Sequence, residues 1–181
     1  MGTKEMARTL RFLKANGFDT HFAQTGSEAK EKMLELIPRN AMVGVADSAT
    51  LRQIGVLEAL VHRGSEIINP FVPEMTTGIE KDSTKRREFI GMMRKTFGAD
   101  VFITGSNAVT MDGNIVNVDR NGNRVAGMIF AAPRVILAIG RNKIVKDVNA
   151  AIDRIKNVWA PAHTKQKGHG SPEDIDIGFD G

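Results

Sequence analysis

Apolar residues recur along this chain in two patterns, and the two patterns alternate. Several runs carry apolar side chains at the three- to four-residue spacing of an amphipathic helix, and short, almost wholly apolar runs lie between them. The predicted helices are residues 3–16, 27–37, 51–61, 79–97, 125–130 and 145–158. The predicted strands are residues 18–23, 41–46, 66–69, 101–104 and 134–139. Residues 70–78, which contain two prolines, are predicted to form a loop.

This alternation predicts an α/β fold with a single doubly wound, mostly parallel sheet flanked by helices. Asp112-Gly113 lies between two short extended runs and predicts an antiparallel hairpin. The domain is expected to cover residues 1–162, and residues 163–181 form a polar, Gly-rich tail.

Polar residues follow two of the predicted strands, in loops 47–50 and 104–110. Ligands of such sheets bind outside the carboxyl ends of the strands, so both loops are expected to line one crevice. A helix N-terminus there favours an anion, and Gly105 allows a ligand to approach the backbone closely. The candidate ligand-binding residues are Asp47, Ser48, Thr50, Thr104, Gly105, Ser106, Asn107, Asn123, Arg124 and Lys143.

Within this set, Arg124 or Lys143 would pair a carboxylate, while Thr104 and Asn107 would orient it. Each assignment has a structural alternative. Ser48 or Thr50 is also placed to cap a helix, residues 112–114 are also ordinary turn formers, and Lys143 is also compatible with a solvated position. Asp119 is the candidate acid–base residue, since the chain lacks a recognisable Ser–His–Asp grouping, a nucleophile elbow, a P-loop and a G-x-G-x-x-G motif.

Composition further narrows the classes of function open to this chain. The 181 residues include no cysteine, which excludes thiolate nucleophiles and thiolate-held clusters within the chain. The net charge is +4, and the basic run at 81–95 reads as a solvated helix face, so no nucleic-acid partner is expected. No apolar run reaches membrane-spanning length, which favours a cytoplasmic protein without membrane association. His163 and His169 lie in the polar tail, and no metal or other cofactor is expected.

Four stretches of the chain share the pattern of a known family: Val43–Gly55, Thr104–Asp119, Gly122–Ala126 and Ile139–Val145. They resemble the lactate-utilisation (LUD) domain family, which includes lactate-utilisation protein C. The resemblance implies a NagB/RpiA/CoA-transferase-like fold. It also implies a link to a complex that oxidises L-lactate to pyruvate, in which partner subunits carry the iron–sulfur clusters.

The chain departs from the family pattern at three points. Its tail has no cysteine, Ala46 and Asp47 stand where relatives often have a glycine, and no glutamate matches the nucleophile of CoA transferases. The expected function is that of a LUD-type subunit or stand-alone protein that binds a small anionic metabolite, such as lactate or another organic acid. A homo-oligomer is compatible with this function. The alternatives are an isomerase or acyl-CoA transferase that uses Asp119, and a non-catalytic interaction module that uses the tail and residues 70–78.

Overall fold

The computed structural model describes residues 3–162, so the predicted tail at 163–181 lies outside the described residues. These residues form two compact units. The sheet unit contains residues 21–105 and 119–139, and the hairpin unit contains residues 3–20, 106–118 and 140–162. Within the described range, no helix has both the length and the apolar character needed to cross a membrane.

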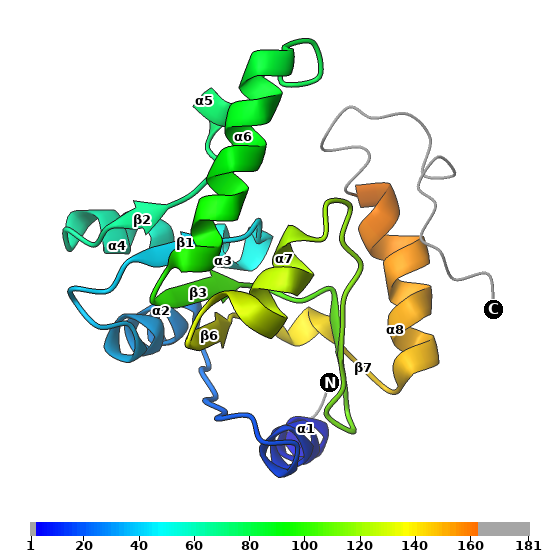
Figure 1. The fold of residues 1–181 in the computed structure, drawn as a ribbon. Coiled ribbons are helices and arrows are strands. Elements are labelled where there is room, and N and C mark those ends of the chain that lie inside the picture. The colour runs from blue at the N-terminus through cyan, green and yellow to red at the C-terminus, as the bar shows by residue number, and fades with distance from the viewer. Residues whose placement is uncertain (1–2, 163–181) are drawn as a thin grey trace. The chain divides into compact units, whose positions relative to one another are not determined.

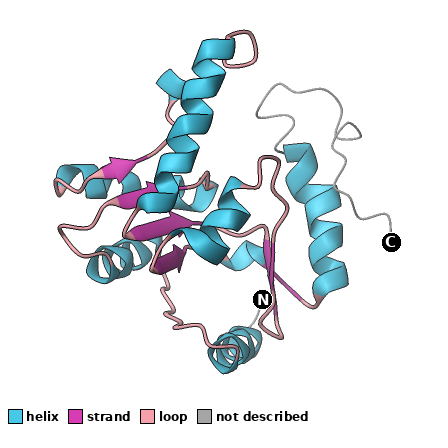
Figure 2. Ribbon diagram, viewed as in Figure 1, coloured by secondary structure: helices cyan, strands magenta, loops and turns pink. Residues whose placement is uncertain are grey.

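The sheet unit is built on four parallel strands, in the order β2-β1-β3-β6 (Figures 1 and 2). Their bounds are β1 Val43–Val45, β2 Ile67–Ile68, β3 Val101–Thr104 and β6 Arg134–Leu137. After β1 the chain adds β2 on one side and then returns to add β3 on the other. The carboxyl ends of β1 and β3 therefore flank the point where strand order reverses, which is the usual ligand position in such sheets. The predicted mostly parallel α/β architecture is confirmed.

One face of this sheet carries the main hydrophobic core. Its helices are α2 (Gly26–Leu36), α3 (Ala49–Ile54) and α4 (Val56–His62). Val43, Val45, Val101 and Ile103 point into this core because alternate residues of a strand share a face. They meet Met33, Ile37, Leu51, Val56 and Leu60 from the helices.

The opposite face is covered by two helical turns, the 3-10 turn η1 (Thr96–Gly98) against β1 and the π-helical turn η2 (Gly127–Ala131) against β3. Helix α6 (Ser83–Lys95) leads into η1 and carries α5 (Pro73–Thr76), and α7 (Asn123–Ala126) leads into η2. Gly44 and Gly127 permit close packing here. A β-carbon on Gly44 would lie 2.6 Å from the Thr96 carbonyl oxygen, and one on Gly127 would lie 2.3 Å from the ring of the fully buried Phe102.

The hairpin unit has a three-stranded sheet in the order β5-β4-β7. Its elements are α1 (Thr3–Ala15), β4 (Ala108–Thr110), β5 (Ile115–Val116), the 3-10 turn η3 (Arg141–Lys143), β7 (Ile144–Val145), α8 (Val148–Arg154) and the π-helical turn η4 (Ile155–Trp159). Strand β4 runs antiparallel to β5, which confirms the predicted hairpin, and parallel to β7. The hairpin tip packs on α1, where Asn16 Nδ2 donates to the Gly113 carbonyl at 3.0 Å.

Several predicted boundaries are wrong. Residues 18–23 form no strand: the alternating phenylalanines Phe18 and Phe22 are 43% and 51% exposed and line no sheet. The predicted loop at 70–78 contains α5, which starts at Pro73. Residues 144–145 form β7 instead of starting the last helix, since a two-residue strand leaves no periodic signal.

The helix starts were misplaced because capping depends on local geometry. Helix α2 starts at Gly26 instead of residue 27, because the Thr25 hydroxyl caps it by accepting the N–H of Glu28 at 3.1 Å. Helix α6 starts at Ser83 instead of Ile79, because the Asp82 carboxylate accepts the N–H groups of Thr84 and Lys85. The helix predicted at 51–61 is divided by Gly55, whose φ of +69° ends α3.

Candidate functional site

The carboxyl end of β1 leads through Ala46, Asp47 and Ser48 into α3. Ser48 is nearly buried, and its hydroxyl oxygen accepts the N–H of Leu51 at 3.3 Å. This bond confirms the helix-capping alternative for Ser48. Thr50 lies in the first turn of α3 and is half-buried. The cap fixes the direction in which α3 leaves the sheet, and so it places Arg52 one turn further on.

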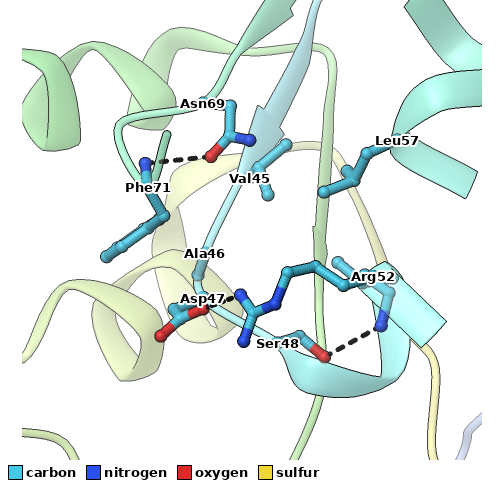
Figure 3. Close-up of a pocket in the computed structure, with 9 residues that line it drawn as sticks. Val45, Ala46, Asp47, Ser48, Arg52, Leu57, Asn69 and Phe71 are labelled. Atoms are coloured by element: carbon cyan, nitrogen blue, oxygen red, sulfur yellow. Dashed lines mark hydrogen bonds and ion pairs between the residues drawn. The ribbon is translucent and has the colours of Figure 1, made fainter. Parts of the chain in front are cut away.

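Arg52 turns back from α3 and forms an ion pair with Asp47, in which its Nη1 donates to the Asp47 carboxylate (Figure 3). The two side chains are 44% and 30% exposed, respectively. The pair therefore lies at the solvent edge of the β1 end, where water screens it.

The pair borders a small hollow of about 30 Å³. Its walls come from the end of β1, from α3 and α4, and from the loop after β2 (Figure 3). The lining residues are Val45, Ala46, Asp47, Ser48, Leu51, Arg52, Leu57, Asn69 and Phe71. The hollow thus combines apolar walls with a paired cation and anion.

The loop after β2 is held in place from two sides. Asn69 Oδ1 accepts the N–H of Phe71 at 3.0 Å. The Phe71 ring packs edge-on against Phe89 of α6, with ring centroids 5.6 Å apart and an interplanar angle of 87°. Phe71 is therefore a fixed wall of the hollow.

Arg124 and Asp119 are joined at the start of α7. Asp119 Oδ2 accepts the backbone N–H groups of Arg124 and Val125, at 2.7 and 3.1 Å. Burial lowers the pKa of the Arg124 guanidinium from its usual 12.5, and the negative charges of Asp119 and Asp47 oppose that fall. The sheet unit thus gathers two carboxylates and two guanidinium groups, Asp47, Asp119, Arg52 and Arg124, around the carboxyl end of β1.

Thr104 ends β3 and is fully buried. Its hydroxyl finds no hydrogen-bond partner among residues 3–162. Strand alternation places its side chain on the same face as Phe102. Gly105 follows it and is also buried.

Asn107 and Ser106 belong to the hairpin unit, where both are buried and form hydrogen bonds across the hairpin. Asn107 Oδ1 accepts the N–H of Val118 at 3.0 Å, and Asn117 Oδ1 accepts the N–H of Asn107 at 3.1 Å. Ser106 Oγ donates to the carbonyls of Ala108 and Val116. Arg154 of α8 adds a further hydrogen bond, in which its Nη1 donates to the Asn107 carbonyl at 2.7 Å.

The predicted site residues are therefore distributed over both units. The sheet unit holds Asp47, Ser48, Thr50, Thr104, Gly105, Asn123 and Arg124, together with Asp119. Ser106, Asn107 and Lys143 lie in the hairpin unit, Lys143 as the last residue of η3. That both groups line one crevice stays a prediction.

Sequence reasoning missed Arg52, Asn69 and Phe71. A signal for Arg52 was present, because a cap at Ser48 places residue 52 one helical turn from the end of β1. Asn69 and Phe71 follow β2 at the same edge of the parallel sheet, although a two-residue strand makes that edge hard to locate. Among the described residues, no group of three or more His, Cys, Asp or Glu side chains could hold a metal ion; His163 and His169 lie outside that range.

Comparison with known protein families identifies the domain to which most of the chain corresponds. The LUD domain matches residues 6–172, which is most of the chain. No curated protein and no solved structure matches it.

Proposed function

This chain belongs to the LUD domain family, and we propose from that premise that it serves lactate utilisation by binding a small organic acid at the carboxyl end of β1. The observation that carries the proposal is the Asp47–Arg52 ion pair at the edge of a partly apolar hollow. A guanidinium fork matches the geometry of a carboxylate, and Asp47 already supplies one to Arg52. The pair therefore resembles a bound acid, with a side chain in the place of the ligand.

The size of the hollow indicates how a free acid would enter. A volume of about 30 Å³ holds roughly two water molecules, and a hydroxy acid of several heavy atoms needs more room. The ligand is thus proposed to displace the Asp47 carboxylate from Arg52. The negative charge of Asp47 acts on the pKa of Arg124, so the displaced carboxylate keeps a cation nearby.

The remaining walls suit a short hydroxy or keto acid. Val45, Leu57 and Phe71 offer apolar surface to an alkyl group. The Asn69 side-chain amide borders the same hollow and carries N–H donors for a hydroxyl or carbonyl oxygen. This combination favours an organic acid over a sugar phosphate, which would place more polar atoms against these walls.

Calorimetric titration of the full chain with lactate, pyruvate and other short organic acids tests the proposal. In Asp47→Asn, Arg52 loses its internal competitor, and the ligand is expected to bind about two- to fivefold more tightly, the range that an exposed ion pair can supply. In Arg52→Gln, binding is expected to fall at least tenfold. Arg39→Gln is the matched control, since Arg39 is an exposed arginine of the same unit away from the hollow.

Unchanged ligand binding in Arg52→Gln would show that the ligand does not bind at the carboxyl end of β1. Weaker binding in a correctly folded Asp47→Asn would show that Asp47 helps to hold the ligand instead of competing with it.

The redox step of lactate oxidation is proposed to belong to partner proteins. The chain has no cysteine, and iron–sulfur clusters are held mainly by cysteine thiolates. Affinity purification of the full chain from lactate-grown cells should recover iron–sulfur proteins, and their absence would contradict this part of the proposal.

A further inference from the structure

Phe71 supplies the aromatic wall of the hollow at the carboxyl end of β1. It lies in the segment between β2 and α5, across Val45 from Leu57 of α4 (Figure 3). The side chains of Phe71 and Leu57 are both half-buried. An acid that is held by Arg52 and directs its apolar group away from Leu57 therefore meets the ring of Phe71.

Three features restrict the movement of Phe71. The buried Pro70 before it has a fixed φ and disfavours a helical backbone at Asn69. The backbone N–H of Phe71 donates to Asn69 Oδ1 at 3.0 Å. The ring packs edge-on against Phe89, with the two ring centroids 5.6 Å apart. A ligand that pushes the Phe71 ring aside therefore has to break this edge-on contact.

Phe89 is in turn fixed with respect to the sheet. It belongs to α6, whose start is capped by Asp82 and whose end continues into η1. The buried Thr96 begins η1, and its hydroxyl donates to the Met93 carbonyl at 2.7 Å. The turn η1 packs against β1. Strand β1 thus carries Asp47 at its end and, through η1 and α6, also determines where the Phe71 ring lies.

The hollow has little room for an apolar group larger than a methyl group. Its volume of about 30 Å³ already requires the Asp47 carboxylate to leave Arg52 before a hydroxy acid can enter. That displacement makes room for the carboxylate of the ligand and leaves the Phe71 ring where it is. A longer apolar group on the same acid would therefore collide with the ring.

Given the proposed function, on which this step rests, we infer that Phe71 is the specificity-determining residue of the site and limits it to acids of about the size of lactate. Phe89 does not line the hollow and is a positioning residue, which acts by holding the Phe71 ring. In an apolar pocket a single methylene changes the affinity roughly 10–200-fold. A fixed ring in this position is thus sufficient to separate lactate from longer hydroxy acids.

Phenyllactate tests the inference, because it is lactate with a phenyl ring on the methyl carbon, the same ring that Phe71→Ala removes. Calorimetric titration of the full chain with lactate and with phenyllactate gives the ratio of the two affinities. The wild type is expected to bind lactate at least tenfold more tightly than phenyllactate. In Phe71→Ala this ratio is expected to fall at least tenfold, since the ring of the ligand can then pack against Phe89. Lactate itself should bind Phe71→Ala within about threefold of the wild type, because its methyl group reaches little of the ring.

Variants of Phe89 test the positioning role by the same ratio. Phe89→Leu keeps an apolar side chain and removes the edge-on contact, so the preference for lactate is expected to fall severalfold while lactate affinity stays the same. Phe89→Tyr keeps the ring and should retain the wild-type ratio. Phe22→Ala is the matched control, since Phe22 is an exposed phenylalanine of the same unit that does not line the hollow. Its ratio should equal that of the wild type.

The possible outcomes separate this inference from the proposed function. Lactate binding by both proteins, with the same preference in the wild type and Phe71→Ala, would overturn the role of Phe71. Equal affinity of the wild type for lactate and phenyllactate would overturn the size limit. Phe71→Leu removes the ring and keeps apolar packing, so it gives the same reading if Phe71→Ala does not fold. Failure of the wild type to bind any short organic acid would contradict the proposed function itself, and the inference with it.

Discussion

Asp112 at the turn of the hairpin shows how one hydrogen bond adjusts a carboxyl group. The Thr110 hydroxyl donates to its carboxylate, and this bond is the largest of the effects that lower the pKa of Asp112 below its usual 3.8. Thr110 is itself fully buried, and its hydroxyl oxygen accepts the N–H of Asn114 at 2.9 Å. The two bonds close the turn between β4 and β5.

Because the pKa of Asp112 is lower in the folded state, its contribution to stability is present above the unfolded pKa and is lost as the pH falls through the folded value. Thr110→Val keeps the side-chain shape and removes the donor, so the pKa of Asp112 is expected to rise towards 3.8. Titration of the Asp112 carboxyl carbon by NMR measures this directly. An unchanged pKa in Thr110→Val would mean that another group causes the shift.

At the same scale, Asn107 shows what a residue type cannot reveal. From the sequence, Asn107 is expected to orient a bound carboxylate, and that role stays a prediction. Its structural partners are the backbone of Val118 and the guanidinium of Arg154, the latter 47 residues away. Burial lowers the pKa of Arg154, whose Nη1 reaches the Asn107 carbonyl. No local sequence pattern predicts such a partner, because the contact depends on how α8 packs on β4.

Among the elements, α7 donates two hydrogen bonds to a single carboxylate, that of Asp119. Asp119 accepts two backbone N–H groups in the first turn of α7, the interaction that a capping residue supplies. This gives Asp119 a structural task that does not require proton transfer. The acid–base assignment stays a prediction, and the two roles can be separated by substitution.

In Asp119→Asn the amide oxygen can still accept, and the free energy of unfolding is expected to fall by less than about 1 kcal/mol. In Asp119→Ala the cap is lost, and a decrease of about 1–2 kcal/mol is expected. Chemical denaturation of both variants measures the difference. If an acyl-transfer or isomerase activity is found, its survival in Asp119→Asn would exclude the acid–base role. Its loss in a stable Asp119→Asn would support that role.

The elements that could be predicted from the sequence are those with a long or strongly apolar pattern. Strands β1, β3 and β6 and helix α1 were located within a few residues. The strand predicted at 18–23 failed because two exposed phenylalanines imitate the alternation of a half-buried strand. The break at Gly55 was missed because apolar spacing continues across it from Ile54 to Leu57. Hydrophobic periodicity records which side chains are apolar, and only the folded backbone decides where a helix changes direction.

For the whole molecule, the division into two units predicts which elements a local substitution destabilises. Gly113 has a φ of +85°, and a β-carbon there would lie 2.8 Å from Asn16 Nδ2 and 2.9 Å from the Phe12 carbonyl carbon. Gly17, in the same unit, has a φ of +87° with no atom within 4 Å. The two glycines thus differ in packing and share a left-handed backbone.

Gly17→Ala is expected to cost about 1–2 kcal/mol for the left-handed conformation alone, and Gly113→Ala should cost more because the hairpin tip must also move away from α1. Native-state hydrogen exchange measures both the size and the extent of the effect. In Gly113→Ala, protection should fall in β4, β7 and α8 and persist in β1 and β3 of the sheet unit. Equal loss in both units would show that they unfold as one.

The candidate site also shows what the sequence alone leaves open, namely which side chains of a helix face the strand ends. The sequence predicted that the ends of β1 and β3 matter, and Asp47 and Ser48 lie at the end of β1. It selected Arg124 and Lys143 as cations for a carboxylate, whereas Arg52 is the cation that lines the hollow. Arg52 was missed because one helical turn of rotation decides whether such a side chain faces solvent or the strand end.

The two units also differ in how their segments follow one another along the chain. The chain passes between them after residues 20, 105, 118 and 139. The sheet unit is complete once residue 139 has been made, whereas the hairpin unit still lacks β7 and α8. During synthesis at about 5–20 residues per second, the parallel sheet can therefore form while α1 and the hairpin wait for their last partners. The hairpin unit, which contains α1, therefore begins first during synthesis and is completed last.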